Sequence, residues 1–321
     1  MKNNIKASLS LFLLATVIMA TSVQSCGAKP LQELDPKDIM PDNPETVTRN
    51  FNYTDFNGIS VSGIVTVQLV KSNSYKVEIT LPENLDKYLD VSVSKGILKI
   101  GWKDNLPSKL LSKLSNKQVK AEIAMPMLQS LEMSGFTAFY CTDEFNIGHK
   151  EFDVRIAGGS KIGDLNIKAE KLDAKISGAS KISLSGNFDE ADIELSGSSK
   201  AELMFDATEL EIDAAGASSA NCSGKYNKAE IEASGAASLK LKGTVNSLVV
   251  ESSGASKVDA MGAEADNAAV SAAGSSQVRV NVNKSLVTEA TGASTVKYKA
   301  SPNANVVLRE VTRSASVSRV N

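Results

Sequence analysis

The sequence has very little of what most enzyme active sites are built from. It contains one histidine and three cysteines among 321 residues, and aromatic residues make up 5% of the chain. The single histidine, His149, has no second histidine and no cluster of acidic residues near it in sequence. A lone histidine in a loop is more often exposed to solvent than poised as a catalytic base. We therefore predict that the protein is not an enzyme. A glycan-active enzyme that uses His149 or one of the chain's regularly spaced acidic residues is the alternative.

An excess of positive charge is also missing. Lys and Arg total 35 against 37 for Asp and Glu, which gives a formal net charge of −2 and a pI of about 5.7. Proteins that bind nucleic acid present a basic face or stripe, so no nucleic-acid partner is predicted. The sequence has no calcium loop of the D-x-D-x-D-G kind, and no metal or other cofactor is predicted. The scarcity of aromatic residues is expected if small side chains fill a narrow core.

The apolar run near the N-terminus, Leu9–Ala20, is too short to cross a bilayer. It follows Lys2 and Lys6, which is the arrangement of a signal peptide. The next segment, Val23-Gln24-Ser25-Cys26-Gly27, resembles a bacterial lipobox.

These features predict a lipoprotein signal peptide over residues 1–25, lipidation of Cys26, and an extended tether with four prolines over residues 26–46. A cysteine that carries more than one acyl chain anchors a protein stably to a membrane. The predicted location is therefore the outer membrane, on its periplasmic or cell-surface side.

What the sequence does have is a short repeat. A run of Gly-[Ala/Ser]-Ser or a close variant recurs nine times, at intervals that are 18 to 20 residues long except for a first interval of 23. The repeat glycines are Gly135, Gly158, Gly178, Gly197, Gly216, Gly235, Gly254, Gly274 and Gly292. A period this short and regular is typical of a solenoid. Gly63 is predicted to be a displaced tenth member of the series.

Within each repeat, apolar and polar residues alternate strictly on both sides of the glycine. In one unit, Leu172, Ala174 and Ile176 precede Gly178, and Ile182 and Leu184 follow it. This is the period of a strand with one buried face. The positions two before, four after and six after each glycine are almost all apolar and are predicted to form ladders in one core, with Asp164 as a departure.

We therefore predict an all-β fold, a parallel and right-handed β-helix. A less regular N-terminal β-strand region covers residues 47–134 and regular coils cover residues 135–321. The glycine allows the backbone to turn sharply at each coil. A leucine-rich solenoid lacks room for its helix, and a propeller blade needs about twice this period.

Two cysteines, Cys141 and Cys222, each lie six residues after a repeat glycine, four coils apart. Strands stack about 4.8 Å apart, which separates them by about 19 Å. A disulfide needs Cα atoms within about 7 Å, so the two are predicted not to bond to each other.

The segments before the regular repeats resemble a known family. The run Y-x-x-F-N-G-I-x-V-S-G-x-V-x-V-x-L spans Tyr53–Leu69 and is followed by Y-K-V-E-I, G-I-L-K-I, A-E-I-A-M-P-M-L-Q-S-L-E-M-S-G and the stacked S-G-A-S units. In this order the motifs resemble the head GIN domain, a family described as auto-transporter adhesin heads and common in lipoproteins of Bacteroidetes. The resemblance covers roughly residues 47–321. It implies an exported β-helical domain and no mapped active site.

Two outward features of the repeat suggest a candidate binding surface. The first is a serine two residues after most glycines, which predicts either a corner column that satisfies the turn backbone or a polar strip that binds a repetitive ligand. The second is a row of acidic residues before the glycines, whose stacked like charges repel. This row is either a solvated face or one that cations such as calcium bridge. The candidate residues are Ser180, Ser199, Ser218, Asp192, Glu194, Glu211, Asp213, Glu230 and Glu232.

The predicted function is a non-catalytic cell-envelope lipoprotein, an adhesin or binding module that presents flat β-helix faces to a glycan or to an envelope or host protein. A structural or regulatory periplasmic lipoprotein is the alternative.

Overall fold

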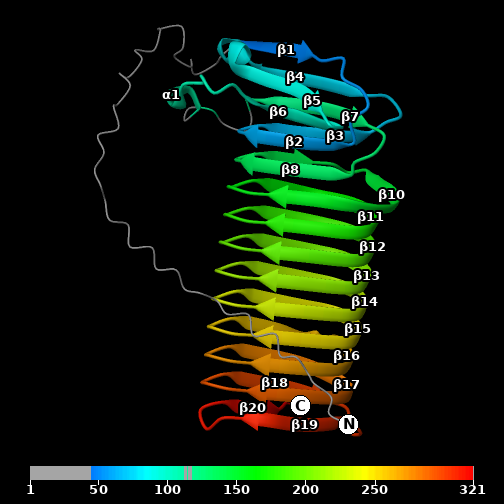
Figure 1. The fold of residues 1–321 in the computed structure, drawn as a ribbon, viewed down its shortest axis with the longest axis vertical. Coiled ribbons are helices and arrows are strands. Elements are labelled where there is room, and N and C mark those ends of the chain that lie inside the picture. The colour runs from blue at the N-terminus through cyan, green and yellow to red at the C-terminus, as the bar shows by residue number, and fades with distance from the viewer. Residues whose placement is uncertain (1–44, 112–113, 115–117, 321) are drawn as a thin grey trace, which may run out of the picture.

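The computed structural model describes residues 45–111, 114 and 118–320. The predicted signal peptide, the Cys26 lipidation site and nearly all of the predicted tether lie outside the described residues. The described chain is an elongated stack of coils, with the less regular N-terminal strands at one end and the C-terminal coil at the other (Figure 1). The prediction of an all-β parallel solenoid is confirmed; its right-handedness stays a prediction.

The N-terminal part contains nine strands and two short helices. The strands are β1 (Thr46–Asn50), β2 (Gly58–Gly63), β3 (Thr66–Lys71), β4 (Lys76–Pro82), β5 (Leu89–Ser94), β6 (Ile97–Trp102), β7 (Lys120–Met125), β8 (Ser130–Gly135) and β9 (Ala138–Tyr140). The helices are the 3₁₀ helix η2 (Glu83–Tyr88) and α1 (Ser108–Leu111). Neither is long or apolar enough to cross a membrane, and the described part of the chain contains no helix that is.

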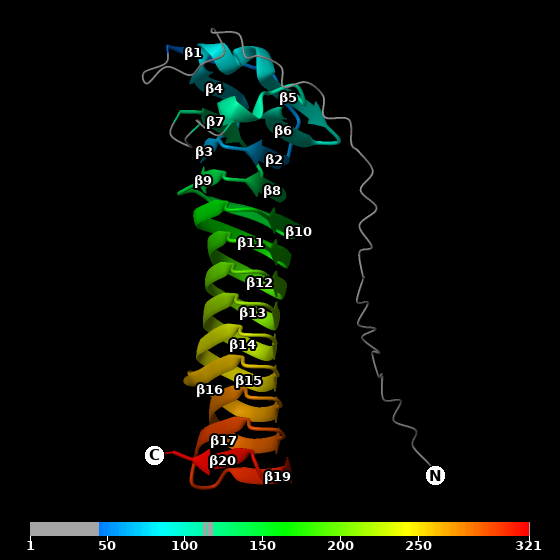
Figure 2. The same ribbon diagram turned by 90° about the vertical axis from the view of Figure 1, so that its left-hand side faces the viewer.

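The regular part consists of long bent strands that each run along two sides of a coil. They are β10 (Glu144–Ile156), β11 (Lys161–Ile176), β12 (Lys181–Leu195), β13 (Lys200–Ala214), β14 (Ser219–Ala233), β15 (Ser238–Ser252), β16 (Lys257–Ala272) and β17 (Gln277–Ala290). The shorter β18 (Thr295–Ala300), β19 (Asn305–Val311) and β20 (Ser316–Arg319) complete the stack. Viewed from the side, the coils form a narrow column (Figure 2).

Each regular strand pairs in parallel with its copy in the next coil. In β12 and β13, for example, Ile182 lies beside Ala201 and Leu195 beside Ala214. We call the half of a coil that follows its glycine the post-glycine side, and the half that leads to the next glycine the pre-glycine side. The two sides meet at a glycine corner and, at the other end of the coil, at an opposite corner.

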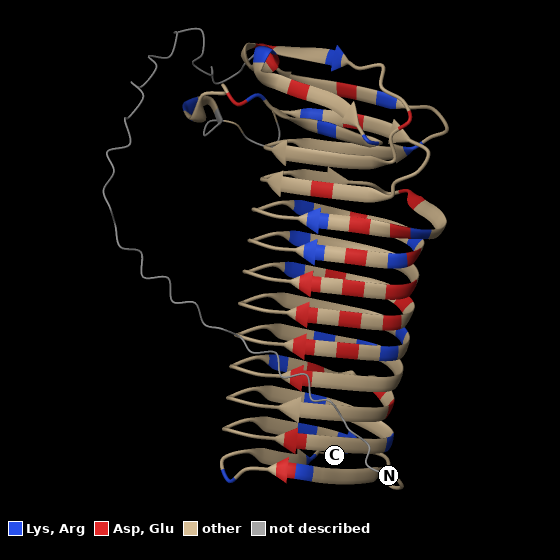
Figure 3. Cartoon of the chain, viewed as in Figure 1, with Lys and Arg blue, Asp and Glu red and all other residues tan. Residues whose placement is uncertain are grey.

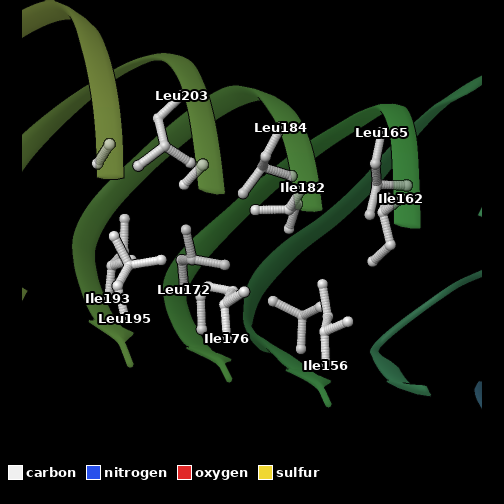
Figure 4. Close-up of a cluster of buried hydrophobic side chains, with 14 of the residues drawn as sticks. Ile156, Ile162, Leu165, Leu172, Ile176, Ile182, Leu184, Ile193, Leu195 and Leu203 are labelled. Carbon is white, nitrogen blue, oxygen red and sulfur yellow. The ribbon is translucent and has the colours of Figure 1, made fainter. Parts of the chain in front are cut away.

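The core lies between these two sides. Ile156, Ile176 and Leu195 come from pre-glycine strands and face Ile182 and Leu203 from post-glycine strands (Figure 4). All of them are at most 1% exposed. The predicted inward ladders are thereby confirmed, and burial of such side chains contributes roughly 1.5–3 kcal/mol each.

The predicted departure at Asp164 is a bulge. Asp164 adopts a φ of +47°, and the register shifts between Ile162 and Leu165. Leu165 therefore takes the core position beside Leu184 and is fully buried. The extra residue turns the carboxylate outward, so the ladder continues without a buried charge.

The glycines stack on one another at the glycine corner. The ten of them, Gly63 included, have φ values from +68° to +99°. A Cβ at Gly197 would lie 2.7 Å from the carbonyl oxygen of Gly178 in the coil above. That oxygen accepts a hydrogen bond from the backbone N–H of Ser198, with an N···O distance of 2.7 Å. Glycine is needed here both for the left-handed φ and for the close approach of two backbones.

Cys141 and Cys222 are both buried, and they are not bonded to each other, as predicted. Cys222 stands in the ladder between Leu203 and Leu241, and burial raises the pKa of its thiol to about 12. Both cysteines therefore act as small apolar residues of the core.

Candidate functional site

The serine part of the predicted binding surface is not on the surface. Ser180, Ser199 and Ser218 are at most 1% exposed. The positive φ of the glycine two residues earlier turns the chain so that the serine side chain points under the corner. The prediction that these three serines could contact a ligand is therefore wrong, and the serine column belongs to the interior of the corner.

Most of these serines hydrogen-bond to the backbone of the corner. The hydroxyls of Ser276 and Ser294 donate to the carbonyl oxygens of Ser252 and Ala272, at 3.0 and 3.1 Å, and that of Ser180 donates to Gly158 at 3.4 Å. The hydroxyls of Ser199 and Ser218 are buried and have no hydrogen-bond partner among the described residues. The column thus closes the turn, as the structural interpretation of the serines predicted.

The acidic part of the predicted surface does lie on one face of the solenoid. We call it the acidic face; it consists of Asp192, Glu194, Glu211, Asp213, Glu230, Glu232 and Glu251 on the pre-glycine sides of β12 to β15. Figure 3 shows these strands with repeated red bands on the near side.

The carboxylates of the acidic face form two ladders along the solenoid axis. Asp192, Glu211 and Glu230 are register neighbours in one of them. The second contains Glu194, Asp213, Glu232 and Glu251. Strands in a sheet lie about 4.8 Å apart, so each carboxylate has a like charge directly above or below it, which is unfavourable.

Lysines compensate only the margins of this face. The Lys171 ammonium lies 2.8 Å from a carboxylate oxygen of Asp192, and the Lys175 ammonium lies 2.6 Å from one of Glu194. At the last carboxylate of the first ladder, Lys228 is 3.1 Å from Glu230. These carboxylates raise the pKa of Lys171 and Lys175 through hydrogen bonds.

The remaining carboxylates, at the centre of the acidic face and in its last coil, have no such salt bridge in the described chain. Within the described residues, no ion pair involves Glu211, Asp213, Glu232 or Glu251. Partial burial and then the neighbouring carboxylates raise the pKa values of Glu211, Asp213 and Glu232. The folded protein therefore holds these negative charges at a cost, and a positively charged ligand would relieve it.

A shallow groove runs beside these charges. Asp213, Glu232 and Glu251 line it on one side, and small residues next to the glycine corner, among them Ser234 and Ser253, line it on the other. Its volume is about 460 Å³. Our sequence analysis did not predict this groove. The sequence feature that could have predicted it is the small residue directly before each repeat glycine, because a small side chain leaves the corner open next to the acidic ladder.

The other sequence candidates do not form a chemical site. The His149 side chain is 97% exposed and lies 3.4 Å from Glu170, its Nδ1 facing a carboxylate oxygen. It lacks the enclosed surroundings that tune a catalytic base. Across residues 45–111, 114 and 118–320, no group of three or more His, Cys, Asp or Glu side chains could hold a metal ion.

The comparisons with known proteins concern nearly the whole described chain. A family model described as "Putative auto-transporter adhesin, head GIN domain" matches residues 55–222 and 203–302. No curated protein matches the chain.

Several solved structures resemble the chain, each over 87% of this chain and 98% of its own. Two are described as putative adhesins, from Parabacteroides merdae (16% identity, TM-score 0.49) and Parabacteroides distasonis (15% identity, TM-score 0.49). A third, also from Parabacteroides distasonis, is described as a putative lipid binding protein (18% identity, TM-score 0.45).

Proposed function

Because the chain belongs to the head GIN domain family of adhesin-like proteins, we propose that it is a non-catalytic binding module of the cell envelope and that the acidic face is its partner-binding surface. The partner is a protein or a glycan that carries positive charge. Lipidation at Cys26 would hold the module at the outer membrane.

The observation that carries this proposal is the uncompensated centre of the acidic face. Glu211, Asp213 and Glu232 stack with carboxylates above and below, and the lysines near the face pair with other carboxylates, Asp192, Glu194 and Glu230. Like charges placed side by side on a sheet lower its stability. Complementary charge on a partner turns that cost into affinity and accelerates the encounter.

The shape of the face suits a binding module. The solenoid is long and narrow (Figure 2), and its regular coils repeat the same outward positions at a fixed spacing. The groove beside Asp213, Glu232 and Glu251 adds a concave strip to an otherwise flat surface. An extended ligand could therefore lie along the axis and contact several coils at once.

A direct test compares charge-neutral variants on a glycan array and on immobilised basic proteins. The double variant Asp213→Asn and Glu232→Gln should lose most of the binding seen with the wild type, and the loss should shrink at high salt because the attraction is screened. Glu264→Gln is the control, since Glu264 is exposed and lies outside the acidic face. Equal binding by all three proteins would overturn the proposal.

Orientation in the envelope requires its own measurement. If the acidic face binds a host or surface partner, protease added to intact cells should digest the module. Protection in intact cells, with digestion only after lysis, would favour the structural or regulatory periplasmic alternative.

A further inference from the structure

Two aromatic rings stand exposed at the post-glycine side of the first coil. Phe136 is 65% exposed and Tyr140 is 39% exposed. Each ring rests on a glycine of the next coil: a Cβ at Gly159 would lie 2.7 Å from the Phe136 ring, and a Cβ at Gly163 would lie 3.4 Å from the Tyr140 ring. One face of each ring is thereby supported by backbone. Exposed apolar side chains that cluster, unlike ones that are scattered singly, mark interaction sites.

A column of three lysines continues from these rings along the axis. Lys161, Lys181 and Lys200 are register neighbours in β11, β12 and β13, about 4.8 Å apart in the backbone. All three are exposed. The Lys161 ammonium lies 5.8 Å from the centre of the Tyr140 ring, which is a cation–π distance.

The three lysines of this column form no salt bridge in the described chain. Lys171 and Lys175 on the other side of the solenoid, by contrast, are both paired with carboxylates. Three stacked ammonium groups repel one another, so the arrangement lowers stability. The column therefore has no evident role in holding the fold together.

The rings and lysines form one contiguous patch. Lys161 pairs in register with Ala138, and Gly163 pairs with Tyr140, so Phe136 and Tyr140 flank the start of the lysine column from the coil above. Gly159 and Gly163 have no side chains, so the Phe136 and Tyr140 rings fit on either side of Lys161. In register the column ends at Ser219, and Glu202, two residues after Lys200 in β13, places a negative charge beside the third lysine.

We propose that this aromatic–lysine patch binds an anionic polysaccharide. The apolar face of a sugar ring can pack on Phe136 and Tyr140, and carboxylate or sulfate groups along the chain can pair with the lysine column. Three lysines followed in register by Ser219, with Glu202 beside the third, suit a polymer with sparse charges. A nucleic acid, with a phosphate on every residue, asks for a longer basic stripe. The patch lies across the solenoid from the acidic face and attracts the opposite charge, so the inference goes beyond the proposed function.

The test measures binding of the full chain to polygalacturonate, with dextran as the neutral polysaccharide and an oligo-dT strand as the nucleic acid. Lys181→Gln and Lys200→Gln should each weaken polygalacturonate binding by up to about fivefold, the range of an exposed ion pair. Phe136→Ala should weaken it by about fivefold or more, because a stacked aromatic surface is lost.

Two matched controls separate the patch from the rest of that side. Lys257 occupies the same position after its glycine as Lys181, is exposed and has no ion pair among the described residues. Met204 is an exposed apolar side chain (56%) outside the patch. Lys257→Gln and Met204→Ala should bind polygalacturonate like the wild type.

Three outcomes would overturn the inference: dextran binding as tight as polygalacturonate binding, equal losses in the patch and control variants, or tighter binding of oligo-dT. Because Asp213 and Glu232 are untouched in every variant, a failure here leaves the acidic face to be judged by its own experiment.

Discussion

Gly135 lies directly beneath Gly63, although strands β3 to β7 separate the two in sequence. The two glycines are register partners in the parallel pair of β8 and β2. A Cβ at Gly135 would lie 2.5 Å from the carbonyl oxygen of Gly63. That oxygen accepts a hydrogen bond from the N–H of Phe136 at 2.7 Å. The N-terminal region and the regular coils therefore share one glycine corner and one continuous sheet.

This contact predicts that the repeat glycines tolerate no side chain. Gly197→Ala should lower the free energy of unfolding by about 2–3 kcal/mol, because it adds a backbone clash to the strain of a φ of +71°. Gly148→Ala is the matched control: its φ is +65°, yet nothing lies within 4 Å of an added Cβ. It should cost only about 1 kcal/mol. If urea denaturation gave equal losses of unfolding free energy for the two variants, the close packing of stacked glycines would contribute nothing to the cost of the added side chain.

The serine column should divide into two classes. Ser276→Ala removes a donor to the Ser252 carbonyl and should lower stability by about 1 kcal/mol. Ser199→Ala removes a buried hydroxyl with no partner in the described chain, so it should be neutral or slightly stabilising. Thermal and urea unfolding of both variants would check this. A large loss of stability in Ser199→Ala would contradict the finding that the Ser199 hydroxyl has no hydrogen-bond partner in the described chain.

The acidic face should make stability depend on pH. The pKa of Glu232 is raised in the folded state by partial burial and then by neighbouring carboxylates, so folded protein binds this proton more readily than unfolded protein. The charge therefore destabilises the fold at neutral pH, and this effect fades as the pH falls through the raised pKa.

Glu232→Gln should accordingly raise stability at pH 7, by less than about 0.5 kcal/mol because the side chain is exposed and screened, and change nothing at pH 3. Asp266→Asn should act in the opposite direction, since Lys284 lowers the pKa of Asp266 through a hydrogen bond. It should lower stability at pH 7 and have no effect at low pH. If both variants changed the stability at pH 7 in the same direction, the opposite pKa shifts of Glu232 and Asp266 could not explain the pH dependence.

The two core cysteines should be unreactive in the native protein. Burial raises the pKa of both thiols, that of Cys222 to about 12, and the thiolate is the reactive form. A thiol reagent at pH 8 should label Cys141 and Cys222 only at the rate of unfolding, in a variant that lacks Cys26. Rapid labelling of either residue without denaturant would mean that the coils open locally.

The lipobox-like segment predicts a lipid anchor at Cys26. In a bacterium that processes lipoproteins, the wild type should incorporate a fatty-acid label and sediment with membranes. Cys26→Ser should lose the label and appear in the soluble fraction. A Cys26→Ser protein that still carries label would place the modification elsewhere.

Much of the fold could be predicted because the repeat is local and strict. Alternation around Gly178 identifies two strand faces, and the regular interval between glycines stacks equal residues such as Ile182 and Ala201. The same regularity predicted the core ladders and the place of Cys222. Gly63 could be recognised as a member of the series only from its motif, since β3 to β7 interrupt the period.

The candidate site was less predictable, because alternation does not apply at a corner. Ser199 follows a glycine with positive φ, and that φ, rather than the strand period, turns the hydroxyl inward. Asp213 and Glu232 lie in straight segments, where the period does hold, and they are outward as predicted.

By itself, then, the sequence determined the solenoid, its period and the residues that fill its core, because each depends on spacing along one coil. Only the tertiary structure decided which polar residues are accessible and which of them meet. The groove beside Asp213, the salt bridges that leave Glu211 unpaired and the position of Phe136 over Gly159 all arise between coils. There, corner geometry and side-chain size set distances that no single repeat encodes.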